Sequence, residues 1–94
     1  MQSFIIERTI PPIFQPADPA DVAVHCRWAS DAYREVGAAW FGGAVVEDRM
    51  FSLVAADGID DLRRYCSLLR IPETDVKLRR VVQFLGPSLA GPRP

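Results

Sequence analysis

The sequence has no long apolar run, no marked excess of charge of either sign, and only two cysteines and one histidine. Its apolar runs span a few residues each, whereas a helix that crosses a bilayer needs about 20, so no transmembrane segment is expected. The 11 basic and 12 acidic residues give a formal net charge of −1, which argues against nucleic acid as a partner. The opening residues, MQSFIIERTI, lack the basic and long apolar stretches of a secretory signal, so a cytoplasmic location is expected.

Short catalytic motifs are also missing. The chain contains no phosphate-binding GxxxxGK loop, no GxGxxG, no GxSxG and no HExxH. The two cysteines are not spaced as CxxC, and in a chain without a secretory signal they are expected to be free thiols.

The 94 residues, of which 49% are hydrophobic, are enough for one core, so a single domain over residues 1–86 is predicted. Residues 87–94, which are rich in proline, are predicted to form a C-terminal tail. Residues 11–19 hold four of the eight prolines and are expected to form an ordered loop.

The periodicity of apolar residues predicts six elements. They are a strand at 3–8, a helix at 19–36, strands at 39–46 and 50–56 joined by a turn near 47–49, a helix at 59–69 and a strand at 75–85. Asp18 and Asp57 are the expected N-caps of the helices, and Gly37 is the expected C-terminal stop of the first. This order, β-α-β-β-α-β, is that of the ferredoxin-like α+β fold, with a four-stranded antiparallel sheet and both helices on one face.

Strict alternation in the second strand would put Trp40, Gly42, Ala44 and Val46 on one face and Phe41, Gly43 and Val45 on the other. The Gly42–Gly43 pair indicates a bulge, or a place where a backbone or ligand approaches closely.

The strands are apolar at consecutive positions, which predicts that both faces of the sheet are buried. Because the helices cover one face only, the open face is expected to pack against a second copy, giving a homodimeric α+β barrel.

Aromatic residues and thiols are the candidate site residues. Large rings usually build the core, but Trp28, Tyr33, Trp40 and Tyr65 could instead line a pocket between sheet and helices. His25, Cys26 and Cys66 could hold a transition metal, because imidazole and thiolate are its common ligands. Buried core thiols are the alternative.

Three segments resemble small actinobacterial ferredoxin-like proteins, a family otherwise known as a domain of unknown function, in which nickel binding is described. These segments are FIIER, WFGGAVVEDRMFSLVAAD and YCSLLRIPETDVKLRRVV, and the resemblance covers about residues 3–83. The residues that match the family pattern are Glu7, Arg8, Trp40, Asp48 and Pro72, with Arg49 in place of a lysine. The family's cysteine and histidine fall on Ser52 and Tyr65, so a nickel site here would need the different set His25, Cys26 and Cys66.

The resemblance adds Glu7 and Arg8 to the predicted ligand-binding residues, and it implies nickel or another transition metal as a cofactor. The first hypothesis for function is therefore a dimeric protein that binds a small molecule or a metal ion. The second is a dimeric-barrel enzyme, a cofactor-free oxygenase or isomerase, in which His25, Tyr33, Asp48 or Tyr65 acts as acid or base in an apolar pocket. The third is a structural subunit that uses the 11–19 loop and the tail as contact arms.

Overall fold

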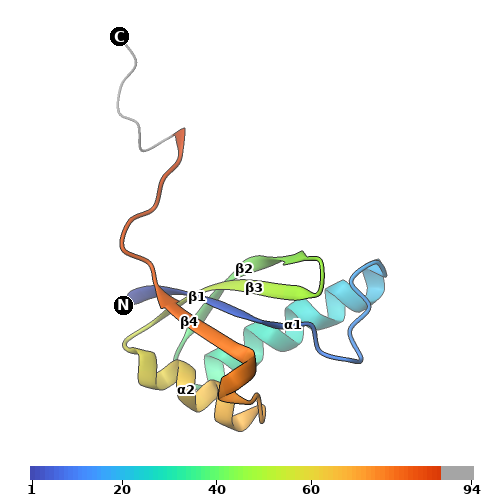
Figure 1. Cartoon of the computed structure of the whole chain (residues 1–94), viewed down its shortest axis with the longest axis horizontal. Coiled ribbons are helices and arrows are strands. Elements are labelled where there is room, and N and C mark those ends of the chain that lie inside the picture. The colour runs from blue at the N-terminus through green and yellow to red at the C-terminus, as the bar shows by residue number, and fades with distance from the viewer. Residues whose placement is uncertain (88–94) are drawn as a thin grey trace.

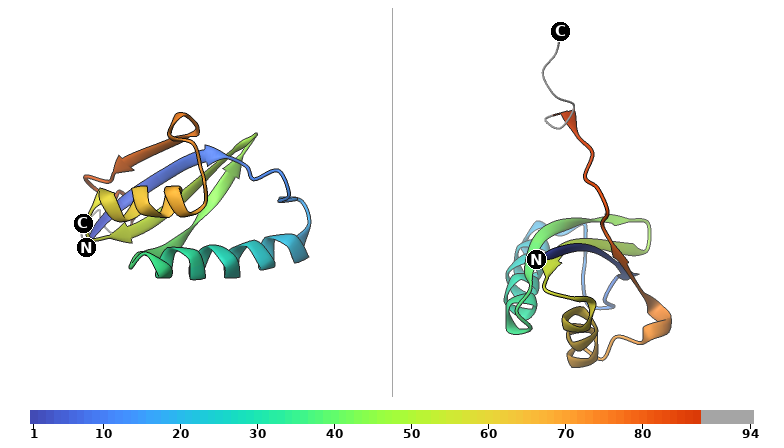
Figure 2. Two further views of the ribbon diagram at one scale, coloured as in Figure 1. Left: turned by 90° about the horizontal axis from the view of Figure 1, so that it is seen from below. Right: turned by 90° about the vertical axis from the view of Figure 1, so that its left-hand side faces the viewer.

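A computed structural model of the chain describes residues 1–87. The elements are β1 (Gln2–Thr9), α1 (Pro19–Glu35), β2 (Ala39–Val46), β3 (Arg49–Ala56), α2 (Ile59–Leu68), a 3-10 turn (Glu73–Asp75) and β4 (Val76–Arg80). The four strands form one antiparallel sheet in the order β2-β3-β1-β4. Both helices lie on the same face of this sheet (Figures 1 and 2), so the predicted ferredoxin-like α+β fold is confirmed.

The two helices begin in different ways. The carboxylate of Asp18 accepts the N–H of Ala20 at 2.9 Å, and Pro19 opens α1, so the predicted cap is confirmed. The predicted cap of α2 at Asp57 is wrong. Gly58, in an extended conformation, occupies the cap position without a side-chain bond, and Asp57 lies one residue too early to take that role.

A bulge in β2 changes which residues face the helices. Trp40 pairs with Val54 and Gly42 pairs with Leu53, so Phe41 is the extra residue. Beyond the bulge every side chain therefore changes face, and Gly43 and Val45 share the helix-covered face with Trp40. The strict alternation predicted from the sequence is wrong for this reason, while the predicted irregularity at the glycine pair is confirmed.

Strand β4 is shorter than predicted. It ends at Arg80 rather than near Leu85, and the N–H of Val81 makes the last bond to β1, with the Ser3 carbonyl at 2.8 Å. In this register Gln2, which still belongs to β1, would lie opposite Val82, so the pairing stops before β1 itself ends. The segment 82–87 leaves the sheet (Figure 1), although residues 82–86 belong to the predicted domain 1–86. Of the predicted tail, residues 88–94 lie outside the described part of the chain.

The core fills the space between the sheet and the helices. Phe4, Ile6 and Val54 point from the sheet and meet Leu62 of α2. The helices are also joined directly, because the Arg64 guanidinium donates to the carbonyl of Val36 at the end of α1, at 2.9 Å. Neither described helix has the length and apolar content that a bilayer span requires.

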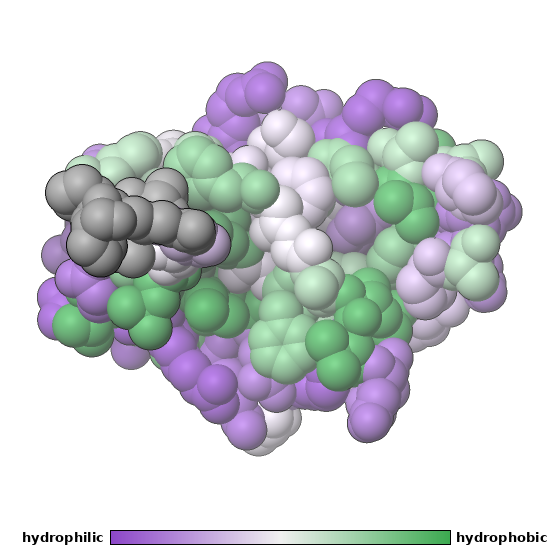
Figure 3. Space-filling view, turned by 90° about the horizontal axis from the view of Figure 1, so that it is seen from above, coloured by the Kyte–Doolittle hydropathy of each residue, from purple (hydrophilic) through white to green (hydrophobic). Residues whose placement is uncertain are grey.

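The open face of the sheet is divided into two parts. One part, over β2, β3 and the middle of β1, is apolar (Figure 3), and the side chains there are Ile5, Ala44, Val46, Phe51 and Leu53.

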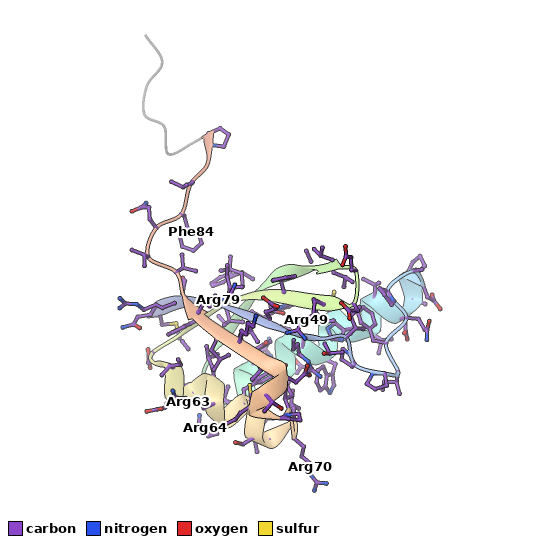
Figure 4. All side chains as sticks on the ribbon, in the orientation of Figure 1. Arg49, Arg63, Arg64, Arg70, Arg79 and Phe84 are labelled. Carbon is purple, nitrogen blue, oxygen red and sulfur yellow. The ribbon has the colours of Figure 1, made fainter. Side chains whose placement is uncertain are left out.

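The other part, over β4 and the paired ends of β1 and β3 that hold Glu7 and Arg49, is ionic (Figure 4). Arg49 lies 3.2 Å from the Glu7 carboxylate and 3.3 Å from that of Asp75, and Arg79 lies 3.7 Å from Glu7. The apolar surface that could pack against a second copy is therefore limited to part of the open face, and burial of that face stays a prediction.

Candidate functional site

Two neighbouring hollows lie where the N-terminal half of α1 meets the 11–16 loop. The helix hollow, of about 350 Å³, lies between this loop, α1 and the end of α2. It is lined by Arg8, Pro11, Ile13, Phe14, Asp21, Val24, His25, Trp28 and Leu69.

The sheet hollow, of about 420 Å³, lies between α1 and the β2–β3 hairpin. It is lined by Phe14, Pro16, Val22, His25, Cys26, Trp40, residues 42–45, Met50, Phe51 and Ser52. Both volumes are within the range of small-molecule sites in proteins.

Phe14 and His25 belong to both hollows. Their rings are stacked, with centroids 4.5 Å apart and planes inclined by 14°, and the ring of Trp28 lies 5.9 Å from that of His25. Burial lowers the pKa of His25, the positive charge of Arg8 lowers it further, and the Asp21 carboxylate opposes them. The imidazole is therefore neutral at pH 7, and it is able to accept a hydrogen bond or a proton.

Arg8 stands at the end of β1 on the helix-covered face, since it follows Phe4 and Ile6 at two-residue spacing and pairs with the buried Met50. Its charge acts on groups of both helices: it lowers the pKa of His25, and it opposes the rise that burial causes in the pKa of Tyr65 and Cys66. Arg8 is thus a cation whose charge is felt by side chains of both helices.

The glycines of β2 leave room for the sheet hollow. A Cβ on Gly43 would lie 1.9 Å from the carbonyl oxygen of Phe51, so the two strands approach as closely as they do only because this side chain is absent. Gly42 has φ of +116°, which the bulge requires and which other residues rarely adopt. Within residues 1–87, Trp40 Nε1 is the one enclosed side-chain nitrogen or oxygen atom without a hydrogen-bond partner.

Tyr33 and Tyr65 lie in the core, and neither lines a hollow. Their rings are stacked 3.9 Å apart, and 3% and 4% of their surfaces are exposed. Burial raises the pKa of both hydroxyls, so both are protonated at every physiological pH. Ser52 lines the sheet hollow, and its hydroxyl is a polar neighbour of Tyr33, so the tyrosine pair lies next to this hollow.

Glu7 and Asp48 lie away from the hollows. Glu7 is on the open face of the sheet in its ion pairs with Arg49 and Arg79, and Asp48 is exposed in the β2–β3 turn. Of the six predicted ligand-binding residues, the structure places three, Arg8, Trp28 and Trp40, around the two hollows.

The predicted metal ligands are not assembled. Both cysteines are free thiols, as predicted, but Cys26 lines the sheet hollow beside His25 while Cys66 is buried in the core. In the part of the chain that the structure describes, no group of three or more His, Cys, Asp or Glu side chains is arranged to hold a metal ion. Metal binding stays a prediction.

Phe14 is the main site residue that the sequence analysis did not single out. It stands in the sequence PPIFQP, where the prolines predict a loop and give no sign of what an aromatic ring contacts. The only available signal is that a large ring lies between prolines that restrict the backbone around it.

A comparison with protein-family models, with curated proteins and with solved structures gave no match for this chain. The geometry of the hollows is therefore the guide to function.

Proposed function

We propose that this protein binds a small, largely apolar molecule in the hollows beside the N-terminal half of α1. The observation that carries the proposal is the pair of hollows that share Phe14 and His25. Their walls are mainly aliphatic and aromatic, with a few polar groups that would fix the orientation of a ligand, which is the usual composition of such sites.

The binding of a neutral fluorescent probe, N-phenyl-1-naphthylamine, tests this proposal. Its fluorescence is expected to rise in a saturable way with the wild-type protein. Val24→Phe is expected to fill the helix hollow, and Val22→Phe the sheet hollow, so each should weaken binding of the probe. Ala23→Phe is the matched control, because Ala23 is exposed on the same helix and lines neither hollow.

The absence of saturable binding would contradict the proposal, and so would equal binding by the wild type and both filled variants. Circular dichroism of each variant shows whether a loss of binding reflects a filled hollow or a misfolded chain.

Catalysis is a second candidate, favoured by the position of His25. Its neutral imidazole lines both hollows, so it could take a proton from a bound molecule. The other predicted acid–base residues, Tyr33, Tyr65 and Asp48, do not line either hollow. His25→Gln keeps a polar side chain and is expected to preserve probe binding while it abolishes any turnover.

We also propose that a second copy covers the apolar half of the open sheet face. Ile5 of β1 and Val46 of β2 are 38% and 54% exposed there, and Phe51 and Leu53 lie on β3, the strand between them. A contiguous apolar surface of this kind is typical of an interface.

Light scattering tests the dimer. The wild type is expected to have the mass of two chains at micromolar concentration, and Leu53→Glu is expected to give one. Leu68→Glu, at an exposed apolar residue of α2, is the matched control and should remain dimeric. A wild-type mass of one chain would refute the interface.

Nickel or another transition metal is a further version of the ligand hypothesis. Metal analysis of protein purified without a polyhistidine tag tests it, and a content far below one equivalent would reject it. The positions of His25 and Cys26 on one wall of the sheet hollow are its only support in the described residues.

A further inference from the structure

Among the arginines of the described chain, Arg8 is the one that is partly buried and has no carboxylate partner. Arg8 and Arg49 are the two that are partly buried. Arg49 has the carboxylates of Glu7 and Asp75 as partners, whereas within residues 1–87 no carboxylate lies within 4.0 Å of the Arg8 guanidinium.

The hydrogen bonds of Arg8 leave most of its guanidinium unused. Its Nε donates to the carbonyl of Thr9 at 3.2 Å, and the two terminal nitrogens have no partner in the described chain. A cation beside apolar walls without a counter-charge is unfavourable, because it loses hydration without gaining an ion pair. The terminal nitrogens of arginine form a planar fork that fits the two oxygens of a carboxylate.

We propose that the helix hollow binds a small aromatic monocarboxylate, with its carboxylate paired to Arg8 and its ring against Phe14 and Trp28. This inference rests on the proposed ligand-binding function and names the class of ligand. The rings of Phe14, His25 and Trp28 form an aromatic wall beside Arg8, and aromatic rings prefer to pack against one another. The volume of about 350 Å³ suits a molecule of one or two rings.

The other charge in this hollow limits the ligand to one carboxylate. Asp21 also lines it, and its Oδ2 already accepts the N–H of Gln15 at 2.6 Å. A second carboxylate on the ligand would meet this negative charge and would be repelled. Monocarboxylates are therefore favoured over dicarboxylates of the same size.

Calorimetric titration with phenylacetate and with its neutral amide, phenylacetamide, tests the proposal on the full chain. The wild type is expected to prefer phenylacetate by roughly tenfold to hundredfold, the usual contribution of a hydrogen bond to a charged partner. Homophthalate, which adds a second carboxylate to the same ring, is expected to bind more weakly than phenylacetate. Arg8→Gln is expected to abolish the preference for the acid over the amide.

Arg27→Gln is the matched control. It removes the same charge from an exposed position on α1 that lines neither hollow, and it should leave the preference unchanged. Because Arg8 has no ionic partner in the described chain, Arg8→Gln is also expected to retain the unfolding temperature of the wild type, which shows that the variant is folded.

Two failures are distinguishable. Equal binding of acid and amide by the wild type, or an undiminished preference in Arg8→Gln, would overturn the inference while leaving the ligand-binding function in place. If neither compound binds and the neutral naphthylamine probe also fails, the proposed function is overturned as well.

Discussion

Replacing Gly43 with alanine is expected to destabilise the protein through a clash between two backbones. A Cβ at this position would lie 1.9 Å from the Phe51 carbonyl oxygen, whereas real Cβ contacts essentially never fall below 3.0 Å. The difference, 3.0 less 1.9, means that β2 and β3 must separate by about 1.1 Å at the Gly43–Ser52 pair. Neighbouring strands lie only about 4.8 Å apart, so this movement breaks ladder hydrogen bonds near the bulge.

Overpacking of this kind costs about 2 kcal/mol. In a domain of this size, that cost lowers the unfolding temperature by roughly 8–16 °C. Thermal unfolding followed by circular dichroism measures it, with Gly86→Ala as the control, because no atom lies within 4 Å of a Cβ there and Gly86 is outside the sheet. An unfolding temperature for Gly43→Ala equal to that of the wild type would refute the described pairing of β2 with β3.

Three further predictions concern capping and ionisation. Asp18→Ala should lower the free energy of unfolding by about 1 kcal/mol, whereas Asp57→Ala, at a residue that caps nothing, should change it by less than about 0.5 kcal/mol in urea denaturation. Burial raises the pKa of the Cys66 thiol, so its alkylation at pH 8 should be much slower in the folded protein than in urea. Burial also raises the pKa of Tyr33 and Tyr65, so the urea midpoint should fall as pH rises above about 10, where only the unfolded chain ionises.

The order of the elements was predictable because each has a local signal. Asp18 and Pro19 mark the start of α1, and the polar Glu47 and Asp48 mark the hairpin turn. The end of β4 was not predictable, because residues 81–85 (VVQFL) are as apolar as those of a strand, and nothing in the local sequence marks the residue at which the pairing with β1 stops. The side-chain faces of β2 were missed because a bulge adds a residue without changing the composition of the strand.

The candidate site was predictable only in part. Arg8, which the family resemblance adds, lines the helix hollow. Of the four aromatic candidates, Trp28 and Trp40 line the hollows, whereas Tyr33 and Tyr65 pack in the core. The sequence does not distinguish the two cases, because a ring on a helix contacts whatever the opposing layer presents. What lies opposite depends on how far α2 extends over the sheet, and this is a property of the tertiary arrangement.

The central position of β1 has a consequence for how the protein folds. β1, the first strand of the chain, pairs with β3 and with β4, which both come much later in the sequence. Gln2 pairs with Ala56, and Phe4 pairs with Arg80. During synthesis, at about 5–20 residues per second, β1 is made first and waits unpaired until β3 and then β4 leave the ribosome. Such pairings between distant parts of a chain form slowly. A nascent or truncated chain that stops before β4 therefore exposes one edge of its central strand, which another unfinished chain could occupy.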